Sequence, residues 1–205
     1  MKHVFMISGK EKKYIMINKW NFRNPTQEEL QNRDRLVAEI GLSPVIALLL
    51  VQRGVSTAEE VRRFFKPSLS HLHDPFLMPD MDKAVKRLNK ALGDKEKILV
   101  YGDYDVDGTT AVSLVYKYLR PYSSTLDYYI PDRCVEGSGV SFQGIDYAEA
   151  NGVKLIIVLD CGIGAVEQVD YAKQKGIDFI ICDHHMPDKD KGWPNAVAVL
   201  DAKRL

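Results

Sequence analysis

The second half of the sequence alternates short apolar runs with helical patterns, and this alternation constrains the fold more than any other feature. Each apolar run is four to six residues long and is bounded by turn residues, as buried strands are. Strands that are apolar on both faces belong to parallel sheets, which helices cover on both sides. We therefore expect an α/β domain whose parallel sheet has helices on both faces. The expected strands are residues 98–101, 126–130, 155–160, 179–183 and 196–200, and the expected helices between them are residues 110–119, 143–150 and 165–175.

The first part of the sequence has signals for three short helices between about residues 25 and 70. Thr26 with Glu29, and Thr57 with Glu60, have the spacing of capping boxes. Pro44 suits the first turn of the helix between them. This pattern predicts a small helical lobe that precedes the sheet.

Three short helices would also suit a helix-turn-helix DNA reader. The third expected helix, however, has acidic Glu59 near its start and basic Arg62 and Arg63 near its end. A recognition helix usually presents its N-terminal residues to the bases, so this charge order disfavours DNA reading. We expect a packing appendage over residues 1–78 and the α/β domain over residues 79–205, truncated at its C-terminal end because no helix follows the last strand.

Composition excludes several classes of protein. The 205 residues include 28 basic and 28 acidic side chains, so the chain as a whole does not indicate nucleic-acid binding. It has neither an apolar run of membrane-spanning length nor a signal-peptide pattern, so we expect a cytoplasmic protein without membrane association. Cys134, Cys161 and Cys182 form no C-x-x-C pair, which argues against a disulfide framework and against a structural zinc site.

An acidic motif, DYDVDG at residues 103–108, follows the first expected strand. Its three carboxylates repel one another and are difficult to bury without a cation. A calcium-binding EF-hand begins in the same way, but it needs a glutamate at the twelfth position, where this sequence has Leu114. We expect the turn to end at Gly108 and a helix to begin at Thr109 or Thr110, at the sheet edge where open α/β folds bind ligands.

Two other expected strands also end in potential metal ligands. Asp160 follows the third strand, and Asp183-His184-His185 follows the fourth. Because parallel strands point the same way, these residues and the acidic motif can meet at one edge. Mixed carboxylate and imidazole ligation suits Mn²⁺, with Mg²⁺, Co²⁺ and Zn²⁺ as competitors. The number of carboxylates favours two ions about 3.5–4 Å apart, the arrangement used in phosphoryl transfer.

The three acidic segments, in this order, resemble motifs one to three of the DHH phosphoesterases. Residues 73–84 and 129–139 are similar to segments that flank these motifs in the RecJ branch of that family. The resemblance implies a metal-dependent exonuclease that degrades single-stranded DNA from the 5′ end in repair and recombination, with a helicase or a single-strand binding protein as possible partners. Other members hydrolyse oligoribonucleotides, cyclic dinucleotides or pyrophosphate, and this is the alternative function.

The resemblance has two departures. Cys134 and Ser138 stand where the RecJ glycine loop commonly has aromatic residues, which puts base or sugar contacts there in doubt. The family's fourth ligand aspartate, its second catalytic domain and its nucleic-acid-binding domain have no counterpart before residue 205. We therefore expect an N-terminal fragment that binds metal weakly and cleaves poorly alone.

Candidate roles follow from the resemblance and from the chemistry of each residue. Asp160, alone at the end of a central strand, would bridge the two ions. Arg133 would neutralise charge on the transition state, or would instead form a surface salt bridge with Glu136. Asp103 is either a ligand or an orienting residue. The candidate metal ligands are Asp103, Asp105, Asp107, Asp160 and His184; the candidate catalytic residues are Asp105, Asp107, Asp160, His184 and His185; and the candidate substrate-binding residues are Arg133, Gly137, Gly139 and His185.

Overall fold

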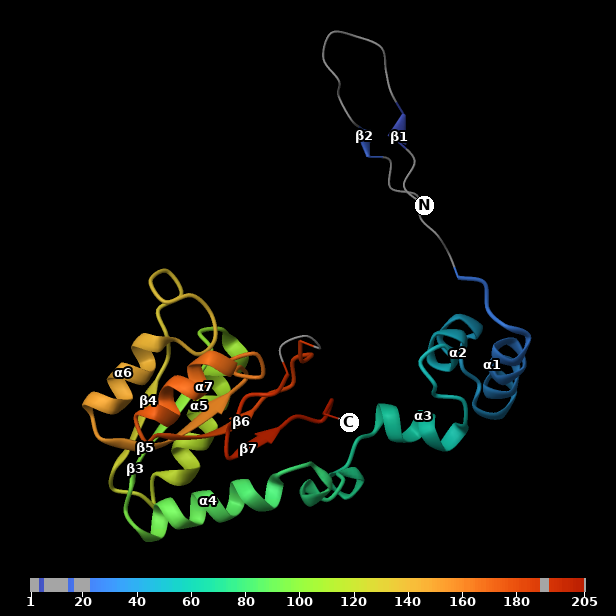
Figure 1. Cartoon of the computed structure of the whole chain (residues 1–205). Helices are drawn as coiled ribbons and strands as arrows, with labels where there is room; N and C mark the ends of the chain where they lie inside the picture. Colours follow the sequence, from blue (N-terminus) through green and yellow to red (C-terminus); the bar gives the residue numbers. More distant parts are fainter. Residues whose placement is uncertain (1–3, 6–14, 17–22, 189–191, 205) are drawn as a thin grey trace. The chain divides into compact units, whose positions relative to one another are not determined.

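The computed structural model describes residues 4–5, 15–16, 23–188 and 192–204 (Figure 1). The chain forms two compact units, Met1–Leu72 and His73–Leu205. The expected domain boundary after residue 78 falls a few residues later than this division, and the domain assignment stays a prediction. Near the N-terminus, β1 (Val4–Phe5) pairs antiparallel with β2 (Ile15–Met16).

Among its described residues, the first unit contains three α-helices and a 3₁₀ turn. They are α1 (Gln27–Ile40), α2 (Pro44–Val51), α3 (Ala58–Phe65) and η1 (Leu69–His71). Both expected capping boxes are formed, since the Thr26 hydroxyl accepts from the N–H of Glu29 and the Thr57 hydroxyl from the N–H of Glu60. A separate core fills the unit, consisting of Leu36, Ala47, Leu50, Val51 and Val61. In the described part of the chain, no helix is long and apolar enough to cross a membrane.

The second unit contains a five-stranded parallel sheet, as the apolar runs predicted. Its spatial order is β4-β3-β5-β6-β7, so β4 and β7 are the edge strands. The register places Val100 beside Tyr128 on one side and beside Ile157 on the other. The strands are β3 (Lys97–Gly102), β4 (Leu126–Tyr129), β5 (Val153–Leu159), β6 (Asp178–Cys182) and β7 (Ala198–Leu200).

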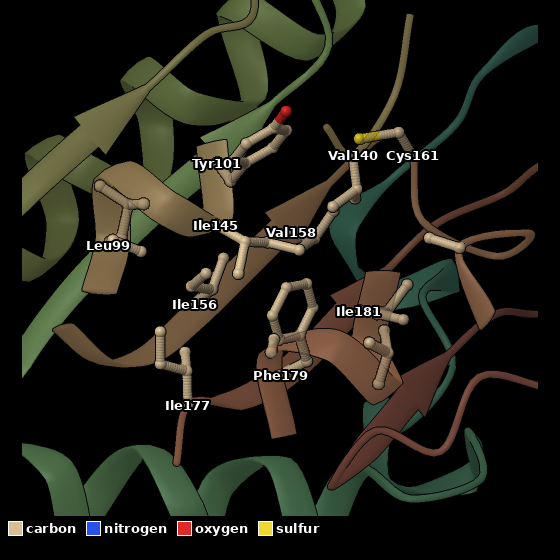
Figure 2. Close-up of a cluster of buried hydrophobic side chains, with 14 of the residues drawn as sticks. Leu99, Tyr101, Val140, Ile145, Ile156, Val158, Cys161, Ile177, Phe179 and Ile181 are labelled. Carbon is tan, nitrogen blue, oxygen red and sulfur yellow. The ribbon is translucent and has the colours of Figure 1, made fainter. Parts of the chain in front are cut away.

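Helices cover both faces of this sheet, which confirms the predicted α/β class. The helices α4 (Met81–Gly93) and α5 (Val106–Leu119) pack on one face, after the short turn η2 (Pro75–Leu77). The other face is covered by α6 (Phe142–Ala150) and α7 (Val166–Gln174). Figure 2 shows the core on this second face, where Tyr101 and Phe179 are its largest fully buried side chains.

The helix after the acidic motif begins earlier than the sequence predicted. We expected it at Thr109 or Thr110, but α5 begins at Val106. The reason is that Asp105 caps the helix, because its Oδ1 accepts hydrogen bonds of 3.0 Å from the N–H groups of both Asp107 and Gly108. A carboxylate in this position satisfies N–H groups that a helix leaves free at its start. The last aspartate of the motif therefore lies in the first helical turn.

Candidate metal centre

Asp160 lies directly after β5, at the carboxyl edge of the sheet. Its N–H donates a 2.9 Å hydrogen bond to the carbonyl of Cys182 on β6. Its φ of 60° lies in the left-handed region that few residues other than glycine adopt. The side chain is only 7% exposed. Backbone pairing and burial thus fix one carboxylate at the point where β5 and β6 end.

Two histidines from the loop after β6 meet this carboxylate. The Nε2 atom of His184 lies 2.9 Å from Oδ1 of Asp160 and 3.7 Å from Oδ2 of Asp107. His185 lies beside it, with the two rings 4.7 Å apart. One ligand atom from each of Asp160, His184 and His185 falls within 4.8 Å of the others. Segments far apart in the sequence therefore place carboxylates and imidazoles together.

Asp183 holds the loop that carries both histidines. Its side chain is 1% exposed, and its oxygens accept hydrogen bonds from the backbone N–H groups of Ile163, His184 and His185. Burial by itself raises the pKa of Asp183, but these hydrogen bonds and the ring of His185 hold it below its ordinary value. The ring contact joins Nδ1 of His185 to Oδ1 of Asp183 at 2.7 Å and raises the pKa of His185. It leaves the Nε2 atom of His185 free to face a ligand.

The charges around Asp160 fit a bound cation. Burial raises the pKa of Asp160, and the negative charges of Asp107 and Asp105 raise it further, while the hydrogen bond with His184 opposes them. A carboxylate removed from water beside other carboxylates is unfavourable unless a positive charge compensates it. Oxygen and imidazole donors are also those that Mn²⁺ and related ions accept. The residues present therefore fit a divalent metal site.

Within the described residues, none of the three aspartates of the acidic motif belongs to the group of ligand atoms that lie within 4.8 Å of one another, although Oδ2 of Asp107 lies 3.7 Å from Nε2 of His184. Asp105 caps α5, as described above. Asp103 is half-buried, and its Oδ1 accepts hydrogen bonds from the N–H of Tyr104 at 2.8 Å and from the N–H of Gly139 at 3.4 Å. These contacts fit the orienting role for Asp103, and its role as a ligand stays a prediction.

Gly108 allows the acidic turn to fold back on itself. A Cβ atom at this position would lie 2.4 Å from the carbonyl oxygen of Asp103 and 2.6 Å from its nitrogen. Real Cβ atoms do not approach backbone this closely, so another residue here must displace the turn. The glycine is therefore required by the close packing of α5 against the end of β3.

The candidate substrate-binding residues lie in the loop after β4. Gly137 and Gly139 both have positive φ angles, 87° and 79°. Arg133 lies over the ring of Tyr104, with its guanidinium carbon 4.7 Å from the ring centroid. In the described part of the chain it forms no ion pair with Glu136, whose oxygens instead accept from Tyr129, Ser141 and the N–H of Asp132. The salt-bridge alternative for Arg133 is therefore not observed.

Sequence reasoning missed part of this centre. It assigned His185 only to catalysis and substrate binding, whereas the structure places His185 in the same group of ligand atoms as His184. It also gave no role of its own to Asp183, although the position of this aspartate directly before His184 and His185 was an available signal. Cys161, which lies nearby, is buried, and burial raises the pKa of its thiol well above the ordinary range. A protonated, buried thiol is unsuited to act as a nucleophile.

Comparison with known proteins agrees with this geometry. Residues 97–204 match the model of the DHH family, N-terminal domain. The chain is 38% identical over 186 residues to the single-stranded-DNA-specific exonuclease RecJ of Bacillus subtilis, covering 91% of this chain and 23% of that protein. It is 34% identical over 181 residues to the RecJ of Escherichia coli, covering 85% of this chain and 30% of that protein. The chain thus spans between a fifth and a third of the length of these relatives.

A solved structure shows the same arrangement of elements. The crystal structure of exonuclease RecJ bound to manganese superposes with a TM-score of 0.58 at 26% sequence identity, over 65% of this chain and 34% of that one. The family match covers more than half of the sequence and includes the whole sheet with the three segments of the candidate centre. The chain therefore belongs to the DHH family, through a match to the N-terminal domain of that family.

Proposed function

We propose that this chain is part of a metal-dependent exonuclease that hydrolyses phosphodiester bonds of single-stranded DNA from the 5′ end. The observation that carries the proposal is the buried carboxylate of Asp160, 2.9 Å from the imidazole of His184 and in the field of two further carboxylates. Clusters of this composition hold the divalent cations that assist phosphoryl transfer. The RecJ relatives, which are named as exonucleases specific for single-stranded DNA, support the choice of substrate.

In this proposal the cluster holds Mn²⁺ or Mg²⁺, and two ions are expected. Asp160 would hold both ions, with Asp107 and His184 as further ligands and Asp105 as a ligand from the start of α5. When bound at these residues, the cations would supply a water molecule with a lowered pKa, which could act as the nucleophile at neutral pH. The manganese-bound RecJ structure supports a divalent metal for a protein of this family.

The other residues act on the substrate. His185, whose ring is oriented by Asp183, neutralises negative charge that builds up on the phosphate oxygens. Arg133 has no carboxylate partner in the described part of the chain, and its place over Tyr104 leaves its N–H groups available for a phosphate. Gly137 and Gly139 have positive φ angles and carry no side chain, so the backbone of their loop can approach a DNA strand closely. A cytoplasmic location, and partners such as a helicase or a single-strand binding protein, stay predictions.

The test is the replacement of Asp160 by alanine in the chain and in any longer protein that contains it. Asp160→Ala should reduce Mn²⁺-dependent release of nucleotides from a 5′-labelled single strand to background, because metal ligands act as a unit. Asp170→Ala, an exposed aspartate on α7, is the matched control and should keep the wild-type rate. A wild-type rate for Asp160→Ala would remove the bridging role.

A substrate panel separates the main proposal from the alternative activity. Single-stranded DNA, single-stranded RNA, a cyclic dinucleotide and pyrophosphate are compared under the same metal conditions. We expect the highest kcat/KM with single-stranded DNA. A higher value with RNA, the cyclic dinucleotide or pyrophosphate would replace the exonuclease by another activity of the DHH family.

A further inference from the structure

A small aromatic cleft lies between α5 and the end of the edge strand β4. Its volume is about 250 Å³, and its lining consists of Val112, Ser113, Tyr116, Tyr128 and Ile130. The rings of Tyr116 and Tyr128 meet edge to face, with their centroids 5.6 Å apart. Tyr128 is 56% exposed, so its ring is available to a molecule from solution. The residues in this cleft have no role in the metal centre described above.

The cleft opens close to the carboxyl edge of the sheet, where the candidate metal centre lies. Tyr128 pairs in register with Val100, which is only a few residues before the acidic motif. The other wall of the cleft is formed by α5, which begins within the acidic motif at Val106. Ser113 is six residues after Asp107 on α5, which corresponds to about 9 Å along the helix axis. A flexible polymer held at the metal centre can therefore reach the cleft.

The charges on this side of α5 favour a polyanion. After Asp107 the helix carries no acidic residue. Lys117, on the helix surface next to Ser113, is exposed, and so is Arg120 immediately after the helix. Neither forms an ion pair within the part of the chain that the structure describes. Asp127 on β4 points to the opposite face of the sheet from Tyr128 and is engaged with Lys97 and the hydroxyl of Tyr147.

We propose that this cleft is a nucleobase-binding subsite, in which a base of the single strand stacks on Tyr128 while Lys117 and Arg120 contact its phosphates. Exposed aromatic rings beside unpaired basic side chains are the combination that binds single strands without sequence preference. The subsite rests on the proposed function, because it holds the strand whose end lies at the metal centre. A purely apolar protein partner would leave the two cations beside the cleft without a counterpart.

Photochemical crosslinking of the wild-type chain tests the contact directly. The probe is an oligothymidylate in which single positions carry 5-iodouracil, which crosslinks to an aromatic ring stacked on it. The expected result is a crosslink to Tyr128 or Tyr116, mapped by mass spectrometry of the digested adduct. Crosslinks that map only to other residues would overturn the proposal, and this result does not depend on whether any variant folds.

Binding measurements test the energetic contribution. Tyr128→Ala should weaken binding of a phosphorothioate oligothymidylate, which resists hydrolysis, by roughly tenfold or more, in line with the loss of one stacked base. Tyr128→Phe keeps the ring and should bind within about twofold of wild type. Tyr122→Ala, an exposed tyrosine that does not line the cleft, is the matched control and should also bind like wild type.

An abasic strand of the same length separates base contacts from phosphate contacts. Its affinity should be the same for the wild-type chain and for Tyr128→Ala, since the phosphates are unchanged. Equal losses of affinity for the normal and the abasic strand in Tyr128→Ala would overturn the subsite. A Tyr128→Ala variant that changes self-association but not strand binding would also overturn it.

Failure of the subsite is distinguishable from failure of the proposed function. A chain that crosslinks at Tyr128 but hydrolyses no strand refutes only the activity, and one that degrades DNA without this crosslink refutes only the subsite.

Discussion

The ring of His185 is oriented by a side chain that itself faces no solvent. Asp183 is buried, and its Oδ1 lies 2.7 Å from Nδ1 of His185. A carboxylate in this place fixes both the tautomer and the direction of an imidazole that faces a metal. The same carboxylate also ties the loop of Ile163 to the histidine loop. One residue thus aligns two of the loops that form the centre.

The first prediction concerns this orienting contact. Asp183→Asn keeps the size of the side chain but replaces one accepting oxygen by an amide group that cannot accept. Asp183 also accepts from the N–H of His184, a proposed ligand, so we expect the affinity for Mn²⁺ to fall by about 10–100-fold, the usual effect of losing a partner that orients a ligand. Isothermal titration calorimetry measures it, and circular dichroism checks the fold. An unchanged affinity in a folded variant would show that Asp183 acts only on stability.

The second prediction concerns pH and the carboxylate of Glu136. Burial by itself raises the pKa of Glu136, but hydrogen bonds from Ser141, the N–H of Asp132 and Tyr129 hold it below the ordinary value. A carboxyl group whose pKa is lower in the folded state than in the unfolded state stabilises the fold. This stabilisation is complete at pH values above the unfolded-state pKa of about 4.3, and it is lost as the pH falls through the folded-state pKa. Glu136→Gln should therefore lower the free energy of unfolding by about 1–3 kcal/mol at pH 7, and by progressively less below about pH 4.

Urea unfolding of both proteins at a series of pH values measures this difference. Glu167→Gln, at an exposed position on α7, is the matched control and should show no such pH dependence. A constant difference between wild type and Glu136→Gln over the whole pH range would contradict the prediction, because it would mean that the charge of Glu136 makes no contribution.

At the scale of elements, the centre depends on how α5 joins β3. The turn between them is short because Asp105 caps the helix and Gly108 packs directly on the backbone of Asp103. The same turn directs Asp107 toward His184, which arrives from β6 on the other side of β5. The position of one helix start thus decides which carboxylate meets the histidines.

The third prediction tests this junction. Gly108→Ala should destabilise the chain by about 1–3 kcal/mol and weaken Mn²⁺ binding, because the new Cβ must push the acidic turn away from α5. Gly93→Ala, at the end of α4, meets no atom within 4 Å and is the control. It should be neutral or slightly stabilising. Chemical denaturation and metal titration measure both effects, and equal behaviour of the two variants would refute the steric argument.

At the scale of the whole molecule, the chain has two units with separate cores. The first unit is built around Leu36, which is fully buried in the helical lobe. The second is built around the central strands of the sheet, where Ile156 is fully buried. Because no residue belongs to both clusters, each unit can gain or lose its packing independently.

The fourth prediction follows from this separation. Differential scanning calorimetry should resolve two transitions in the wild-type chain. Leu36→Ala should shift one of them and Ile156→Ala the other, each through a loss of about 2–5 kcal/mol from a buried cavity. A single transition that both variants shift equally would show that the two units unfold as one.

The sequence by itself determined the fold class and most of the elements. Apolar runs and capping boxes are local patterns, so the five strands and the helices α1 to α3, α6 and α7 lie within a few residues of their expected places. The acidic segments at strand ends could be identified for the same reason, since their position relative to a strand is local information. The early start of α5 was not predicted, because the sequence did not reveal that Asp105 would be used as a cap.

Only the tertiary structure decided which of these residues meet. The strand order places β6 next to β5, and this brings His184 to Asp160 across 24 positions of sequence. It also assigns Asp183 to orient the loops, includes His185 in the cluster and leaves Arg133 on the ring of Tyr104 instead of on Glu136. The physical reason is that a local pattern fixes the backbone conformation of a segment, whereas hydrogen bonds and ion pairs between loops depend on distances that exist only after the sheet has assembled.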